Sequence, residues 1–146
     1  DSPVPLDRVA LNLNLDMVAQ NEAGEIYVAG LHHFPWLSPH IDRVEAQAPA
    51  TVLRGHDSPE WGDQDWTRQS DHFAFFSAGI PFLYFGVEDH EHYHRPSDTF
   101  ETIPQDRFLD FVRTVQIAAR ELDGSLSDIA AQHRDALSEP QPSAAE

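Results

Sequence analysis

The sequence contains no cysteine and no lysine. Without cysteine the chain cannot form disulfide bonds or thiolate metal sites, so any metal ion must be bound by histidine and carboxylate side chains. No stretch approaches the roughly 20 consecutive apolar residues that a membrane-spanning helix needs, which argues against a membrane partner. We also find no internal repeat and no glycine-rich phosphate loop. These absences exclude a disulfide scaffold, a membrane span and a phosphate-loop nucleotide site.

Basic residues are few. The chain has 25 aspartate and glutamate residues against 9 arginines, for a net charge of -16. Such a charge argues against nucleic acid as a partner, because the phosphate backbone would be repelled, and it favours solubility. A length of 146 residues with 40% hydrophobic content is typical of one domain with a real core.

The chain is organised around residues 70–99. Ser70 and Asp71 predict the start of a short helix, because their side-chain oxygens can accept hydrogen bonds from free backbone N–H groups, and Gly79 predicts its end. The apolar run 80–85 then predicts a strand buried on both faces, as in a parallel sheet. Polar residues follow this strand directly, at the end where open α/β sheets bind ligands. This loop is the first candidate for a site.

An earlier segment, residues 9–18, alternates apolar and polar side chains and predicts a strand. Asp16 lies near its carboxyl end, and two readings stay open: the carboxylate projects into a site, or it faces water. Residues 25–29 predict a second short strand, which we expect to pair with the first.

The helices expected around the sheet come from apolar stripes at helical spacing over residues 35–48 and 102–122. Between these helices, the irregular stretch 52–69 carries Trp61 and Trp66, which either wall a substrate pocket or cap the core; we favour the pocket wall slightly.

The expected domain organisation has three parts. Residues 1–123 form the main unit, 124–137 an accessory helix, and 138–146 a disordered tail rich in proline and small residues.

The loop after the central strand holds His90, His92 and His94 among acidic residues. Histidines in a surface loop are more often solvated than bound to metal. If the sheet is parallel, however, His94 and Asp16 both lie beyond the carboxyl ends of neighbouring strands, where an imidazole and a carboxylate are reasonable zinc ligands. Two ligands do not complete a site, since catalytic zinc normally has three from protein.

Three motifs carry a resemblance to a known family. They are NLDMV around Asp16, SDHFAFFSAGIP over residues 70–81, and YHRPSDT over residues 93–99. In this order and spacing they resemble the carboxyl-terminal half of the co-catalytic zinc exopeptidases of metallopeptidase family twenty-eight, which includes bacterial leucyl aminopeptidases. The agreement extends from about residue 9 to residue 122.

The resemblance implies a three-layer α/β/α sandwich with a mainly parallel twisted sheet and two zinc ions. It implies that Asp16 binds one zinc and His94 the other, with peptides as substrates. Ser70 and Asp71 match a stretch beside the metals, so we expect them to orient ligands or substrate, and we expect Tyr93 to line the pocket. Asp98 is expected to order the turn after His94.

The chain departs from the family in a large part of the site. The family's amino-terminal half carries a His-x-Asp motif, a bridging aspartate and a Glu-Glu pair that supplies the general base. Only fifteen residues precede Asp16, none of these groups can be placed among them, and no Glu-Glu dipeptide occurs anywhere in the sequence. We therefore expect this chain to lack peptidase activity by itself.

Two classes of function remain open. The first is a truncated or cleaved part of a zinc aminopeptidase, or of a related carboxypeptidase or glutaminyl cyclase. The second is a non-catalytic binding or assembly module that keeps the fold. In either case an uncovered sheet edge predicts a partner, either the missing amino-terminal half or a second copy of the chain. The resemblance further implies a periplasmic or secreted protein.

Overall fold

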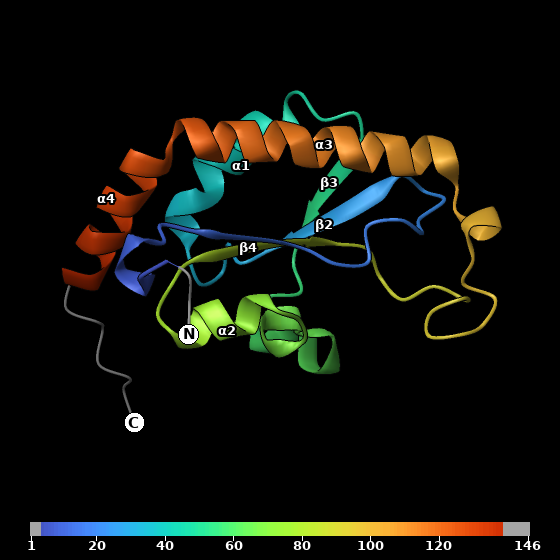
Figure 1. Ribbon diagram of the computed structural model, residues 1–146, viewed down its shortest axis with the longest axis horizontal. Coiled ribbons are helices and arrows are strands. Elements are labelled where there is room, and N and C mark those ends of the chain that lie inside the picture. Colours follow the sequence, from blue (N-terminus) through green and yellow to red (C-terminus); the bar gives the residue numbers. More distant parts are fainter. Residues whose placement is uncertain (1–3, 139–146) are drawn as a thin grey trace.

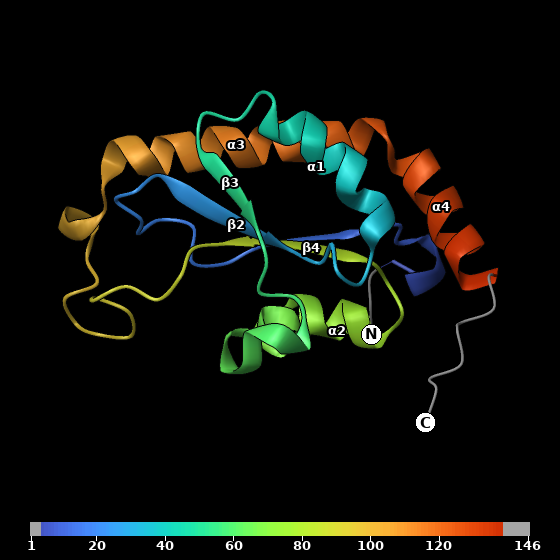
Figure 2. The same cartoon turned by 180° about the vertical axis from the view of Figure 1, so that it is seen from behind.

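The computed structural model describes residues 4–138 and has three layers. Helices α1 and α3 cover one face of a central sheet, and α2 lies against the other face (Figure 1). The view from behind shows the same arrangement, with α4 descending at the end of α3 (Figure 2). The expected α/β class and the α/β/α sandwich are therefore confirmed.

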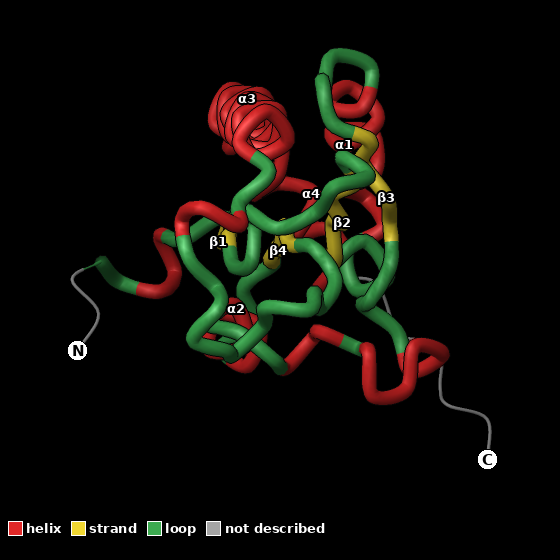
Figure 3. The backbone as a smooth tube through the Cα atoms, turned by 90° about the vertical axis from the view of Figure 1, so that its right-hand side faces the viewer, coloured by secondary structure: helices red, strands yellow, loops and turns green. Residues whose placement is uncertain are grey.

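The sheet has four strands in the order β1-β4-β2-β3, and the end-on view shows this order (Figure 3). Two pairings are parallel, β1 with β4 and β2 with β3, whereas β2 and β4 run antiparallel. The sheet is thus mixed, with one antiparallel junction between two parallel pairs. The strands are β1 (Asn12–Leu15), β2 (Glu25–Ala29), β3 (Thr51–Arg54) and β4 (Phe82–Gly86).

Strand β4 occupies an inner position, as the unbroken apolar run predicts. All five of its residues are buried, which requires cover on both faces. Its position makes one expectation wrong: β2 does not pair with β1, because β4 lies between them. Alternation along β1 predicted a strand, but it carried no information on which strand lies beside it.

Strand β1 is shorter than the alternating segment 9–18 from which it was predicted. The backbone leaves the extended conformation at Met17, whose φ is 53°. A residue with this left-handed φ cannot continue a strand. Asp16 therefore stands immediately after the end of β1.

The helices match the apolar stripes, with displaced ends. The predicted helix 35–48 divides into a 3-10 turn and α1, and the predicted helix 102–122 begins three residues later than expected. A helix also occupies most of the range 124–137, while residues 139–146, where most of the tail was expected, lie outside the described part. The helices are α1 (Ser38–Glu45), α2 (His72–Ser77), α3 (Gln105–Gly124) and α4 (Leu126–Ser138).

The core lies on both faces of the sheet. Between the sheet and the helices α1 and α3, the fully buried Phe85 and Phe111 belong to the larger cluster. On the α2 face, Phe82, Tyr84 and Trp66 belong to a smaller cluster. Among residues 4–138 no helix is long and apolar enough to cross a membrane.

Candidate functional site

The candidate site lies where β1 and β4 end. Because these strands are parallel and adjacent, their carboxyl ends meet at one edge of the sheet. The Asp16 N–H donates to the Phe85 carbonyl (3.3 Å), and the Val87 N–H donates to the Met17 carbonyl (2.9 Å). The segment after β1 is therefore bound to the segment after β4.

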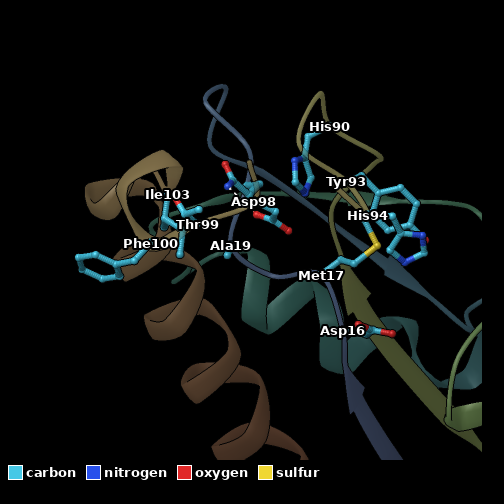
Figure 4. Close-up of a pocket in the computed structure, with 11 residues that line it drawn as sticks. Asp16, Met17, Ala19, His90, Tyr93, His94, Asp98, Thr99, Phe100 and Ile103 are labelled. Carbon is cyan, nitrogen blue, oxygen red and sulfur yellow. Dashed lines mark hydrogen bonds between the residues drawn. The ribbon is translucent and has the colours of Figure 1, made fainter. Parts of the chain in front are cut away.

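A cavity of about 500 Å³ opens at this edge. Figure 4 shows His94 beside Tyr93, Asp16 at the end of β1, and Phe100 and Ile103 at the other end of the cavity. Asp16 and His94, which are far apart in the sequence, thus line one cavity, and their role as metal ligands stays a prediction. The lining residues are Asp16, Met17, Ala19, Gln20, His90, Tyr93, His94, Asp98, Thr99, Phe100 and Ile103.

Two residues at the cavity have left-handed backbone conformations. Met17 has a φ of 53° and His94 a φ of 55°. In an extended strand Asp16 and Met17 would point to opposite faces, but the turn at Met17 lets both side chains line the cavity. Non-glycine residues in this conformation are uncommon and cluster at functional sites.

The Asp16 carboxylate is held by Ser70. The Ser70 hydroxyl donates to Asp16 Oδ2 at 2.7 Å. Ser70 was expected to cap α2, and this expectation is wrong: the cap position falls on Asp71, and the helix start has no side-chain capping bond. The hydroxyl has one hydrogen, and the carboxylate is a stronger acceptor than a neutral group. Ser70 orients Asp16 instead.

The other predicted residues lie as follows. The Tyr93 ring stacks on the His94 imidazole, with centroids 3.8 Å apart, and both line the cavity. The Asp98 N–H donates to the Arg95 carbonyl (3.0 Å), and its carboxylate accepts from Gln20 Nε2 (3.1 Å). Asp98 therefore helps fix the turn after His94. Asp71 is exposed at the start of α2, and its expected role stays a prediction.

The two tryptophans have different environments. Trp66 is buried in the smaller core cluster and also lines a cavity of about 60 Å³ with Asp16 and Tyr93. Trp61 is 37% exposed and packs on His56, with centroids 4.0 Å apart. His56 is fully buried, and its ring stacks on Trp66 at 3.7 Å. Trp66 therefore belongs to the core and also lines a small cavity, whereas Trp61 covers His56; a substrate pocket at this place stays a prediction.

Two residues near Asp16 were missed by sequence reasoning. The Tyr84 hydroxyl donates to the Asp16 carbonyl at 3.4 Å, and burial, with the Asp16 carboxylate nearby, raises the pKa of Tyr84. His72 is fully buried at the start of α2, and burial lowers its pKa below the ordinary value of 6.5. The signal that could have pointed to His72 is an imidazole at the first position of a mostly apolar helix.

The fold and the cavity define an α/β/α sandwich with a carboxylate and an imidazole at the carboxyl ends of two parallel strands. Residues 1–118 match the family described as Peptidase family M28, and the chain belongs to that family. It is thus a peptidase-like hydrolase of the metallopeptidase class, and peptidases of this family are generally zinc-dependent. Comparison with curated proteins gave no match, and neither did comparison with solved structures.

The described residues provide fewer donors than a zinc centre needs. Among residues 4–138 there is no group of three histidine, aspartate or glutamate side chains placed to hold a metal ion. Asp16 and His94 are two suitable donors at one cavity, and Ser70 already occupies one oxygen of Asp16. A catalytic zinc needs three protein ligands. The described residues therefore do not form a complete zinc centre.

Proposed function

We propose that this chain provides Asp16 and His94 to the site of a zinc-dependent aminopeptidase that removes N-terminal residues from peptides. The observation that carries the proposal is that these two side chains line one cavity in a member of a peptidase family. Asp16 would serve one zinc ion and His94 the other. Ser70 would hold Asp16 in its binding orientation, and Tyr93 would hold the His94 ring.

The charge of the cavity favours an aminopeptidase over a carboxypeptidase. Its lining includes Asp98, a carboxylate that is not assigned to zinc, and none of the described lining residues is an arginine. A carboxypeptidase must pair a cation with the carboxylate of its substrate, whereas an aminopeptidase must accept an α-ammonium group. The Asp98 carboxylate suits the ammonium group.

The far end of the cavity is apolar. It is lined by Phe100 and Ile103 (Figure 4), and Met17 and Ala19 lie along the same cavity. Burial of an apolar side chain against such residues is favourable by about 25 cal/mol per Å². We therefore infer that the cavity accepts a peptide whose first residue is apolar.

The rest of the site would come from a further polypeptide segment. Strand β1 is an outer strand, and because it pairs with β4 on one side only, the backbone groups of Leu13 and Leu15 point outward. Leu15 is 46% exposed and lines an apolar groove of about 230 Å³ against Phe111 and Val115 of α3. A segment pairing parallel with β1 would end beside Asp16, where further ligands and a general base are needed. We propose that the missing amino-terminal half, or a second copy of the chain, fills this place.

The test measures zinc content, turnover and mass in one sample. The purified chain, supplied with zinc, is assayed on a leucyl chromogenic amide, and light scattering gives its oligomeric state. We expect no turnover, weak zinc binding that Asp16→Asn and His94→Ala each reduce, and association of the chain at high concentration. His92→Ala, in the same loop but outside the cavity lining, is the matched control and should bind zinc like the native chain.

Three results would count against the proposal or a part of it. Two zinc ions per chain with turnover would mean that the described residues, or residues 1–3 and 139–146, complete the site. Zinc binding unaffected by Asp16→Asn would remove Asp16 from the site. A clean monomer at high concentration would count against the second copy as the partner.

For the compartment, we propose export to the periplasm or the medium.

A further inference from the structure

A buried histidine lies behind the Asp16 side chain, outside the cavity. His72 is fully buried. Its ring stacks on Tyr84, with centroids 4.9 Å apart and planes 14° apart, and packs on Phe82 at 4.5 Å. The two rings hold the imidazole plane, so its nitrogen atoms have fixed directions.

The partner of His72 Nε2 determines its tautomer. This nitrogen lies 3.0 Å from the Trp66 carbonyl oxygen. A carbonyl oxygen only accepts, so Nε2 must carry the hydrogen. Burial lowers the pKa of His72, which keeps the ring neutral near pH 7, and Nδ1 is then an acceptor.

Asn14 connects His72 to Ser70 through hydrogen bonds. Its Nδ2 lies 3.3 Å from His72 Nδ1 and 3.0 Å from Ser70 Oγ. The amide nitrogen has two hydrogens and can donate to both atoms. Because Ser70 Oγ accepts from Asn14, its single hydrogen is directed to Asp16 Oδ2 at 2.7 Å.

The opposite orientation of the Asn14 amide would disrupt the hydrogen bonds from Asn14 to His72 and Ser70. With Oδ1 in place of Nδ2, two acceptors would face each other at His72 Nδ1. The same Oδ1 would compete with Asp16 for the Ser70 hydrogen. The unprotonated Nδ1 of His72 therefore selects the amide orientation that leaves the Ser70 hydrogen for Asp16.

We propose that His72 is a positioning residue, which acts through Asn14 and Ser70 to fix the orientation of the Asp16 carboxylate. The relevance to zinc rests on the proposed function, in which Asp16 is a ligand. The hydrogen-bond chain itself does not depend on that function. It explains why an amide side chain stands in β1 and an imidazole in an apolar helix.

The first test is made on the native chain without metal. In a long-range ¹H–¹⁵N spectrum of histidine-labelled protein, His72 should show a protonated Nε2 and an unprotonated Nδ1. The opposite tautomer would overturn the proposal. This measurement requires no variant and no activity.

The second test is a pair of variants that are read at Asp16. In His72→Phe the ring and its stacking are kept, but both nitrogens are removed; Asn14→Leu removes the donor between His72 and Ser70. In each variant, the Asp16 side chain should change from a single χ1 rotamer to an average over several rotamers, which three-bond couplings measure. Ser70→Ala should have the same effect, because it removes the hydrogen bond to Asp16 directly. The double variant His72→Phe/Ser70→Ala should show no further loss, because the two residues act in series. His32→Phe, at an exposed histidine, is the control.

A fixed Asp16 rotamer in both His72→Phe and Asn14→Leu would contradict the proposal, provided that amide spectra show folded chains. If His72→Phe does not fold, Asn14→Leu and the tautomer measurement still decide.

Zinc titration separates the two proposals. We expect His72→Phe to weaken zinc binding about 10-fold or more. If Asp16→Asn leaves zinc binding unchanged, the proposed function fails, while the rotamer measurement still judges the role of His72.

Discussion

A substitution at Gly86 tests how closely β4 approaches the end of β1 at the site. It is the last residue of β4. A Cβ atom at this position would lie 2.7 Å from the Tyr84 hydroxyl oxygen and 2.9 Å from the Asp16 carbonyl oxygen. The Asp16 carbonyl cannot easily move away, because bonds from Asp16 N–H to Phe85 (3.3 Å) and from Val87 N–H to Met17 (2.9 Å) hold the adjacent backbone.

We therefore expect Gly86→Ala to destabilise the chain and displace Asp16. Overpacking of this kind costs about 2 kcal/mol. For a domain near this size, that lowers Tm by about 4 to 8 °C. Calorimetry or thermal circular dichroism measures the shift, and amide spectra should show changes at Asp16 and Met17.

Two further variants make the reasoning refutable. Gly124→Ala, where a Cβ meets no atom within 4 Å, should leave Tm unchanged or raise it, since alanine is the better helix former. Adding Tyr84→Phe to Gly86→Ala should recover part of the loss, because it removes the nearest atom. A Gly86→Ala chain as stable as the native one would show that β1 and β4 do not approach as closely as described.

The remaining predictions concern the core and pH. Phe111→Ala, at a fully buried ring, should cost about 3 to 5 kcal/mol in urea unfolding, whereas Phe100→Ala, at a ring 68% exposed, should change stability by about 0.5 kcal/mol or less; equal losses would contradict the described core. Burial lowers the pKa values of His72 and His33 below 6.5. As pH falls below 6.5, the unfolded chain therefore binds protons that the folded chain does not, and the free energy of unfolding should decrease. Urea midpoints at about pH 7.5 and about pH 5.5 measure this slope, which should be shallower in His72→Phe than in the native chain; identical slopes would remove His72 as a cause.

Several features could be predicted from the sequence because they depend on local pattern. A continuous apolar run between two glycines specified β4 as a strand buried on both faces, and alternation specified β1. Gly79 closes α2 with a φ of 76°, as a glycine just after a helix predicts. The motifs around Asp16 and His94 carried the family and placed two donors at the carboxyl ends of strands.

Other features were decided only by the tertiary structure. Periodicity tells which face of a strand is buried, but not which strand lies beside it, so the insertion of β4 between β1 and β2 was not predicted. Ser70 had two acceptable partners, the start of α2 and a carboxylate distant in the sequence. Only the packed fold brought Asp16 within reach.

The composition alone determined that any metal ligands must be histidines and carboxylates, since the chain has no cysteine. Sequence could not determine how many of them meet, because ligand geometry depends on backbone turns such as those at Met17 and His94, with φ of 53° and 55°. Nor could the sequence reveal the series of hydrogen bonds that runs from Trp66 through His72 and Asn14 to Ser70. Each hydrogen bond in that series joins residues that lie apart along the chain, and the direction of the series follows from the Trp66 backbone carbonyl, which only folding places against the imidazole.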